Sequence, residues 1–90
     1  MKIQSQEEKR IIQNRLSRLE GQIRGINRMV EEDRECGEVL QQLSATRSAL
    51  QGTIEAYMEG MVNDCLLAED VDSESRRKLA SEMLAIIHRA

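Results

Sequence analysis

The sequence lacks several residue types that small globular domains normally use. It has no proline, phenylalanine or tryptophan, and Tyr57 is its only aromatic residue. A core must therefore be filled by Leu, Ile, Val, Met and Ala, and no proline interrupts a long helix. A 90-residue helical chain so poor in aromatics often reaches stability by oligomerising. The composition predicts an all-α protein that assembles with further copies of itself.

Histidine and the patterns of catalytic sites are equally scarce. His88 is the single histidine, and no serine or cysteine stands nearby in the sequence for it to activate. No glycine-rich phosphate loop is present, so we do not expect an enzyme. The two cysteines, Cys36 and Cys65, form no CxxC pair, which disfavours a four-ligand zinc site.

No segment resembles a signal peptide, and none approaches the ~20 apolar residues of a membrane span. We therefore expect a cytoplasmic protein with no membrane partner. Thiols are normally kept reduced in that compartment. Two cysteines there indicate chemistry or metal binding more often than a structural disulfide, and inert core thiols are the simpler alternative.

Hydrophobic periodicity predicts two long helices and one short helix in a single domain, residues 1–90. The first helix should span about residues 5–32, with Ser5 and Glu8 as a capping box. The second should begin near Cys36 and end between about Cys65 and Ala68, and Asp72 or Ser73 should cap the third. Heptad spacing places two apolar seams on the long helices: Ile12, Leu16, Leu19, Ile23, Ile26 and Val30 on the first, and Leu40, Leu43, Leu50, Ile54, Tyr57 and Met61 on the second.

The cysteines stand at the two ends of the second helix. They are 29 residues apart, which is roughly 43 Å along a continuous helix. A disulfide needs Cα atoms within about 7 Å, so these thiols can meet only between chains, for example in two antiparallel copies that cross near Leu50 and Gln51. Met61 lies one turn before Cys65, where it is either ordinary packing or a thioether ligand.

Positive charge is concentrated in the first helix, although the net charge of the chain is −3. Residues 1–28 hold seven basic and three acidic side chains, so a partner would meet a basic surface there. A helical wheel places four arginines on the side away from the seam and Arg15 at its flank. Those four are Arg10, Arg18, Arg24 and Arg28. A solvated arginine face is the simpler interpretation of this cluster on the first helix. On the second helix, Arg47 interrupts the apolar seam.

Two segments carry a family resemblance. Residues 15–36 read RLSRLEGQIRGINRMVEEDREC and residues 39–50 read VLQQLSATRSAL. Both resemble the CsoR/RcnR family of bacterial transcriptional repressors, over about residues 9–66. The resemblance implies an antiparallel helical dimer that assembles into a flat dimer-of-dimers tetramer and binds operator DNA without a helix-turn-helix. It also implies that an inducer bound between protomers releases the DNA.

The branches of this family differ in their ligand pattern. Copper sensors carry a cysteine and then His-x-x-x-Cys; Cys36 and Cys65 match the cysteines, but Met61 stands at the histidine position. The pair of cysteines without the histidine is similar to the persulfide-sensing, CstR-like branch. The leading hypothesis is therefore a repressor without a cofactor, which reactive sulfur species switch by forming di- or polysulfide links between Cys36 and Cys65 of neighbouring protomers. The alternative is a Cu(I)-responsive repressor of a copper-efflux operon, with Cys36, Met61 and Cys65 as ligands.

DNA binding would then rest on basic side chains of the two long helices. The candidates are Arg15, Arg18, Arg24, Arg28 and Arg47, with Lys9 or Arg10 as weaker ones. Arg15 and Arg47 match basic positions of the family pattern. A helical interaction module with inert thiols and no DNA partner is the alternative from a different functional class.

Overall fold

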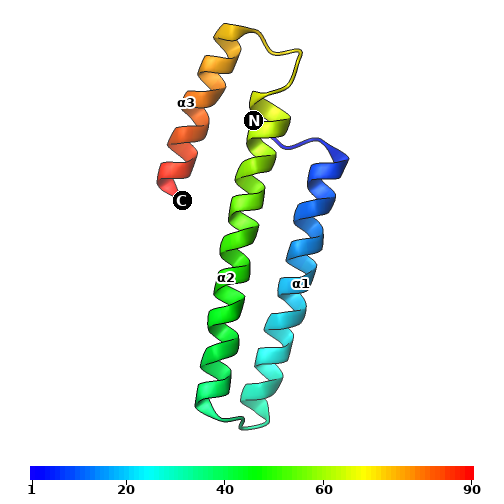
Figure 1. Ribbon diagram of the computed structural model, residues 1–90, viewed down its shortest axis with the longest axis vertical. Coiled ribbons are helices and arrows are strands. Elements are labelled where there is room, and N and C mark those ends of the chain that lie inside the picture. Colours follow the sequence, from blue (N-terminus) through cyan, green and yellow to red (C-terminus); the bar gives the residue numbers. More distant parts are fainter.

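The computed structural model describes residues 1–90 and contains three α-helices and no strands. Helix α1 spans Gln6–Glu31, α2 spans Cys36–Met61, and α3 spans Ser73–Arg89. Helix α2 continues without a break into one π-helical turn, η1, at Val62–Leu66. Helices α1 and α2 lie antiparallel along the long axis, and α3 runs beside the η1 end of α2 on the side away from α1 (Figure 1). This architecture confirms the all-α prediction.

Side-chain caps mark the beginning of α1 and α3, whereas α2 begins without one. Ser5 Oγ accepts a hydrogen bond from the Glu8 N–H at 3.3 Å, as predicted for the cap of α1. The reciprocal half of the capping box is absent, because the Ser5 N–H donates to Asp64 Oδ2 at 3.3 Å instead. Asp72 caps α3 by accepting from the Ser75 N–H at 2.7 Å, and this hydrogen bond lowers the pKa of its carboxyl group.

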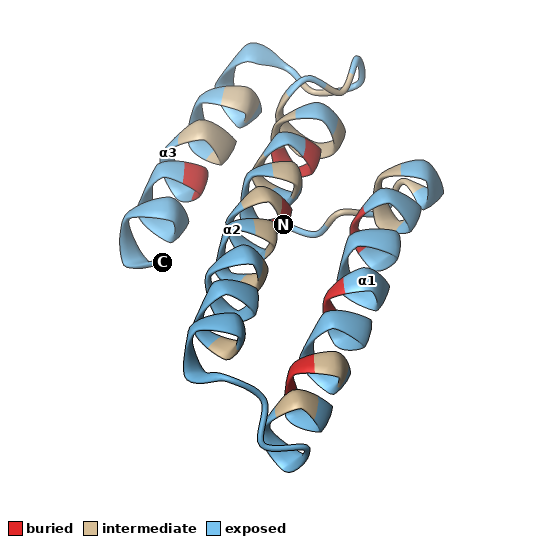
Figure 2. Ribbon diagram, turned by 60° about the horizontal axis from the view of Figure 1, so that its bottom comes forward, coloured by how far each residue is buried: buried red, intermediate tan, exposed pale blue.

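The core is a thin row of contacts between α1 and α2, and Met83 is buried on α3 as well. Ile12, Leu19 and Ile26, one residue per heptad, are buried on α1, and Thr53 and Met61 are buried opposite them on α2. Figure 2 shows how few residues are buried and that those of α1 lie on its side toward α2. The other seam positions stay exposed, and those that we call the apolar band are Leu16, Ile23, Val30, Leu43, Leu50, Ile54 and Tyr57. Half of the predicted α1 seam, and all of the predicted α2 seam except Met61, is therefore exposed in the single chain.

The dimensions show that one chain alone is far from compact. Its accessible surface is 7152 Å² and its radius of gyration is 17.5 Å. A compact monomer of this mass would expose about 5,400 Å², with a radius of gyration of about 12 Å. No helix is both long enough and apolar enough to cross a membrane. The excess apolar surface is of the kind that a second copy of the chain would cover.

Candidate functional site

The two thiols lie at opposite ends of the α2–η1 rod. Cys36 is the first residue of α2 and is exposed, and Cys65 sits in the π-turn and is half-buried. The rod between them is continuous, so the separation of roughly 43 Å expected for helical geometry stands. Neither thiol can reach the other within one chain, as the sequence predicted.

Met61 and Cys65 do come together. They line one small cavity of about 120 Å³, whose wall also includes Met1, Lys2, Ile3, Tyr57 and Ile86. Met61 is buried, and the Cys65 thiol donates a hydrogen bond to the Lys2 carbonyl oxygen at 3.3 Å. Three sulfur-bearing residues of one chain, Met1, Met61 and Cys65, thus line one cavity, and thioether and thiol donors suit a soft cation.

The environment of Cys65 opposes ionisation of its thiol. Partial burial, and then the neighbouring Asp64 carboxylate, raise the pKa of Cys65 above its ordinary value. A thiol held in its protonated form is a weak nucleophile until an incoming group displaces its proton. Cys36 is the exposed thiol that a reagent in solution reaches first.

The π-turn itself is a local feature that the sequence did not reveal. Its defining hydrogen bond runs from the Leu67 N–H to the Val62 carbonyl oxygen at 2.9 Å. Single π-turns within helices occur frequently at functional sites. Here the turn carries Asp64 and Cys65 toward the segment that precedes α1, since both side chains bond to that segment.

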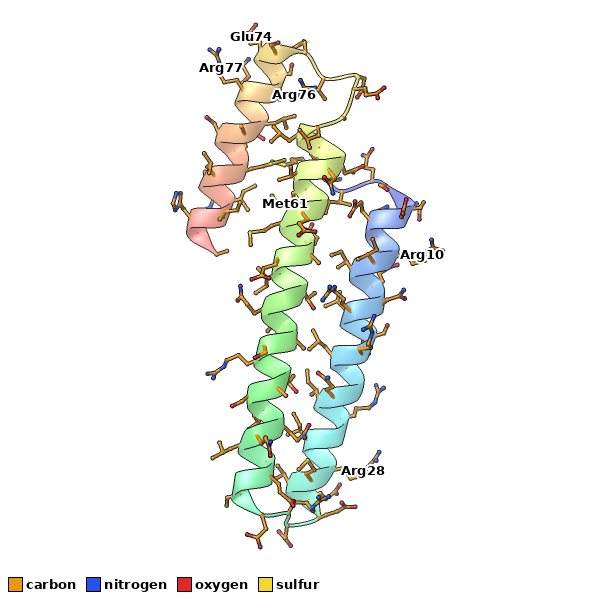
Figure 3. The ribbon with its side chains drawn as sticks, viewed as in Figure 1. Arg10, Arg28, Met61, Glu74, Arg76 and Arg77 are labelled. Carbon is orange, nitrogen blue, oxygen red and sulfur yellow. The ribbon has the colours of Figure 1, made fainter.

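Arg76 holds the chain that follows the π-turn, and sequence reasoning missed it. Its guanidinium donates to three carbonyl oxygens, those of Leu66 at 2.8 Å, Ala68 at 2.9 Å and Val71 at 3.0 Å. Figure 3 shows Arg76 on the side of α3 that faces this loop, while Arg77 points away from it. A signal was present, because a basic residue in the first turn of a helix opposes the helix dipole and therefore indicates a specific partner.

The predicted DNA-binding arginines fall into separate groups. Arg15 and Arg18 line a small hollow between α1 and α2, and Arg15 passes so close to Gly52 that a Cβ there would lie 3.3 Å from its Nη1. Arg10 and Arg28 point outward from α1, away from α2 (Figure 3). Arg24 is exposed as well, with a long 3.9 Å contact to Glu20.

Arg47 lies apart from the other arginines. It is exposed and lines the part of the apolar band that includes Ile23, Leu43 and Leu50. Lys9 is half-buried. The structure therefore brings Arg15 and Arg18 together, presents Arg10, Arg24 and Arg28 to solvent, and places Arg47 on the surface that a partner chain would cover.

Known proteins match this chain over nearly its whole length. Residues 8–89 match the family model described as metal-sensitive transcriptional repressor. The copper-sensing transcriptional repressor CsoR of Bacillus subtilis is 39% identical over 82 residues, which is 91% of this chain and 80% of that protein.

Solved structures share the fold as well. The copper-sensing repressor CsoR with Cu(I) from Geobacillus thermodenitrificans is 34% identical, with a TM-score of 0.80 over 99% of this chain and 92% of that one. A variant of the formaldehyde-responsive regulator FrmR from Salmonella enterica serovar Typhimurium is 27% identical, with a TM-score of 0.82 over 94% and 96% of the two chains. Two of these three relatives sense copper, which favours the Cu(I) alternative over the persulfide-sensing branch. The chain belongs to the family of metal-sensitive transcriptional repressors, the CsoR/FrmR-like regulators, which are not enzymes.

Proposed function

We propose that this repressor binds operator DNA as an oligomer and releases it when Cu(I) binds between protomers. Cys36 of one protomer and Met61 with Cys65 of the other would supply the ligands. The observation that carries the proposal is the cavity shared by Met61 and Cys65, at the opposite end of the rod from Cys36. An antiparallel pair of rods would bring the exposed Cys36 of one copy to that cavity of the other.

The donor chemistry fits a soft monovalent cation. Two thiolates and a thioether are all soft ligands, and Cu(I) prefers such ligands to nitrogen or oxygen donors. Bound Cu(I) would take the place of the thiol protons of the two cysteines. Cys65 would give its proton to solvent on binding, and Met61, a neutral donor, needs no deprotonation. The copper-sensing relatives make Cu(I) the first effector to test.

Oligomerisation follows from the apolar band. Its hollow around Leu50 and Tyr57 holds about 360 Å³ and is lined almost entirely by apolar side chains. A second copy would remove these side chains from water at about 25 cal/mol per Å². The antiparallel dimer and the dimer-of-dimers tetramer are therefore part of the proposal, with the band as the dimer surface.

Operator binding would rest on the basic side of α1. Arg10 and Arg28 point outward and could contact phosphates, as could exposed Arg24 if it leaves its long contact with Glu20. Arg15 and Arg18 would add charge at the α1–α2 hollow. Repeated around a tetramer, this surface would be basic although each chain carries −3. Arg47 is a weaker candidate because its neighbours belong to the apolar band.

The deciding experiment is an anaerobic Cu(I) titration against a strong chelator, with operator release followed by fluorescence anisotropy. The DNA would be a labelled duplex from upstream of the chain's own gene. We expect stoichiometric, tight binding that releases DNA, and a large loss of Cu(I) affinity in Met61→Leu. Met58→Leu is the matched control, because Met58 lines the apolar band and not the cavity of Cys65. Equal Cu(I) affinity in both variants would exclude Met61 as a ligand, and absence of tight binding would exclude Cu(I).

Reactive sulfur is the second candidate effector, favoured by methionine at the position where copper sensors have histidine. The thiolate of Cys36 would attack the outer sulfur of a hydropersulfide RSSH. This forms the Cys36 persulfide and releases RS⁻. The Cys65 thiol of the partner chain would then attack the Cys36 persulfide, forming the disulfide and releasing H₂S. Mass spectrometry after treatment with inorganic polysulfide should reveal a cross-linked dimer containing both cysteines. Met61→Leu separates the two effectors, since it would weaken Cu(I) binding and leave cross-linking unchanged.

A further inference from the structure

The four residues before α1 form a strap across the π-turn. In this N-terminal strap, Lys2–Ser5, the Gln4 N–H donates to Asp64 Oδ2 at 2.6 Å and the Ser5 N–H donates to the same oxygen at 3.3 Å. The Lys2 carbonyl oxygen accepts from the Cys65 thiol at 3.3 Å. Asp64 and Cys65, which are adjacent in the π-turn, thus bond to three consecutive peptide groups of the strap.

The strap also closes the cavity of Cys65. Ile3 lines that cavity, and its Cδ1 lies so close to buried Gly60 that a Cβ there would be 3.1 Å away. A side chain at Gly60 would require Ile3 Cδ1 and Glu8 Oε2, each 3.1 Å from the added Cβ, to shift by a few tenths of an ångström. The strap residues Lys2 and Ile3 are thus part of the wall of this cavity of about 120 Å³, so an occupant at Cys65 would lie directly against the strap.

The end of the strap is the beginning of α1. Ser5 is the N-cap of α1, and its carbonyl oxygen accepts from the Lys9 N–H at 3.0 Å. A shift of the strap therefore moves the first turn of the helix that carries the basic surface. The path from Cys65 to α1 is only three residues long.

We propose that Asp64 is a positioning residue that holds the strap over Cys65 and so couples occupation of that thiol to the placement of α1. The proposal rests on the proposed function, since it names the regulation of the same site. Occupation of Cys65 by a metal or a sulfur atom removes the S–H donor and leaves the Lys2 carbonyl oxygen without its partner. The strap then keeps only its two hydrogen bonds to Asp64, and any displacement of the strap moves the first turn of α1 with it.

The first test measures hydrogen exchange at the Gln4 and Ser5 amides by NMR, without effector. Asp64→Ala should accelerate exchange at both amides about tenfold or more, because a charged acceptor is lost. Asp64→Asn keeps an acceptor oxygen and should restore a large part of the protection. Asp70→Ala is the matched control, since Asp70 is exposed and makes no hydrogen bond through its side chain. Unchanged protection in Asp64→Ala would overturn the proposal.

The second test needs neither Cu(I) nor polysulfide. In a Cys36→Ser background, methyl methanethiosulfonate converts the Cys65 thiol to S–S–CH₃ and releases methanesulfinate. We expect lost protection at Gln4 and Ser5 and several-fold weaker DNA binding. Protection or DNA affinity that stays unchanged in the labelled protein would refute the coupling. A protein that shows both effects and yet binds no Cu(I) would refute the Cu(I) assignment alone.

Discussion

Two glycines of α1 allow stability and DNA binding to be separated in one experiment. A methyl group added at Gly21 or at Gly25 would meet no atom within 4 Å in the single chain. Glycine in a helix interior is about 0.8–1.0 kcal/mol less favourable than alanine. Each substitution to alanine should therefore raise the free energy of unfolding by about 1 kcal/mol, or the Tm by about 4–8 °C for a chain of this size.

The same substitutions should weaken operator binding. A helical wheel places both glycines on the basic side of α1, with Arg24 and Arg28, and added methyl groups would hold a DNA backbone away from that side. We expect about tenfold weaker binding for the double variant, equivalent to about 1.4 kcal/mol. Stability would be measured by urea denaturation at one fixed protein concentration, and affinity by anisotropy.

The outcomes of this experiment differ clearly. Gly37→Ala is the control, because its Cβ would also lie in open space but at the start of α2, and it should leave DNA affinity unchanged. Higher stability with unaltered DNA affinity would remove this part of α1 from the DNA interface. Lower stability would mean that a partner chain packs against the glycines.

Three further predictions test the surroundings of the site. Arg76→Ala should lower the free energy of unfolding by about 2 kcal/mol in urea denaturation, because three carbonyls lose a charged donor. Arg76→Lys should recover only part of the lost stability, and an unaltered denaturation midpoint in Arg76→Ala would contradict a stabilising role for these hydrogen bonds. Because the pKa of Cys65 is raised, its contribution to stability is complete below the pH at which the unfolded thiol ionises and is lost as pH rises through the folded pKa. The wild type should therefore lose stability relative to Cys65→Ser as the pH rises above the ordinary pKa of a cysteine thiol, about 8.5, and parallel profiles would refute this. Leu50→Glu should give monomers in light scattering while Leu67→Glu, at an exposed leucine outside the band, should not; intact oligomers of the first variant would exclude the apolar band as the dimer surface.

The helices were predictable from local signals, and the contacts between them were not. Heptad spacing and the caps at Ser5 and Asp72 predicted both ends of α1, and the start of α3, to within a few residues. Periodicity alone does not say which seam positions face α2 and which stay exposed in the single chain, where Leu19 is buried and Leu16 is not. The division depends on how the helices rotate against each other, which is a tertiary property.

The contents of the site divide in the same way. Spacing placed Met61 and Cys65 one turn apart, and they do share a cavity. The bonds from Asp64 to the strap join residues 60 positions apart, and no local pattern encodes them. The expected capping box failed for that reason, since the Ser5 N–H is already bonded to Asp64. A charged acceptor competes well with the Glu8 side chain for one donor.

The rigidity of the α2–η1 rod determines what kind of switch this chain can form. A continuous helix holds Cys36 and Cys65 far beyond the reach of a common ligand, so no effector can join them within one chain. Any effector that binds both must bridge two rods, and its binding energy then acts on the relative position of two protomers. At the Cys65 end the same effector meets the N-terminal strap, and with it the start of α1. One binding event can thus act on the assembly and on the basic helix together, which is the coupling that release of DNA requires.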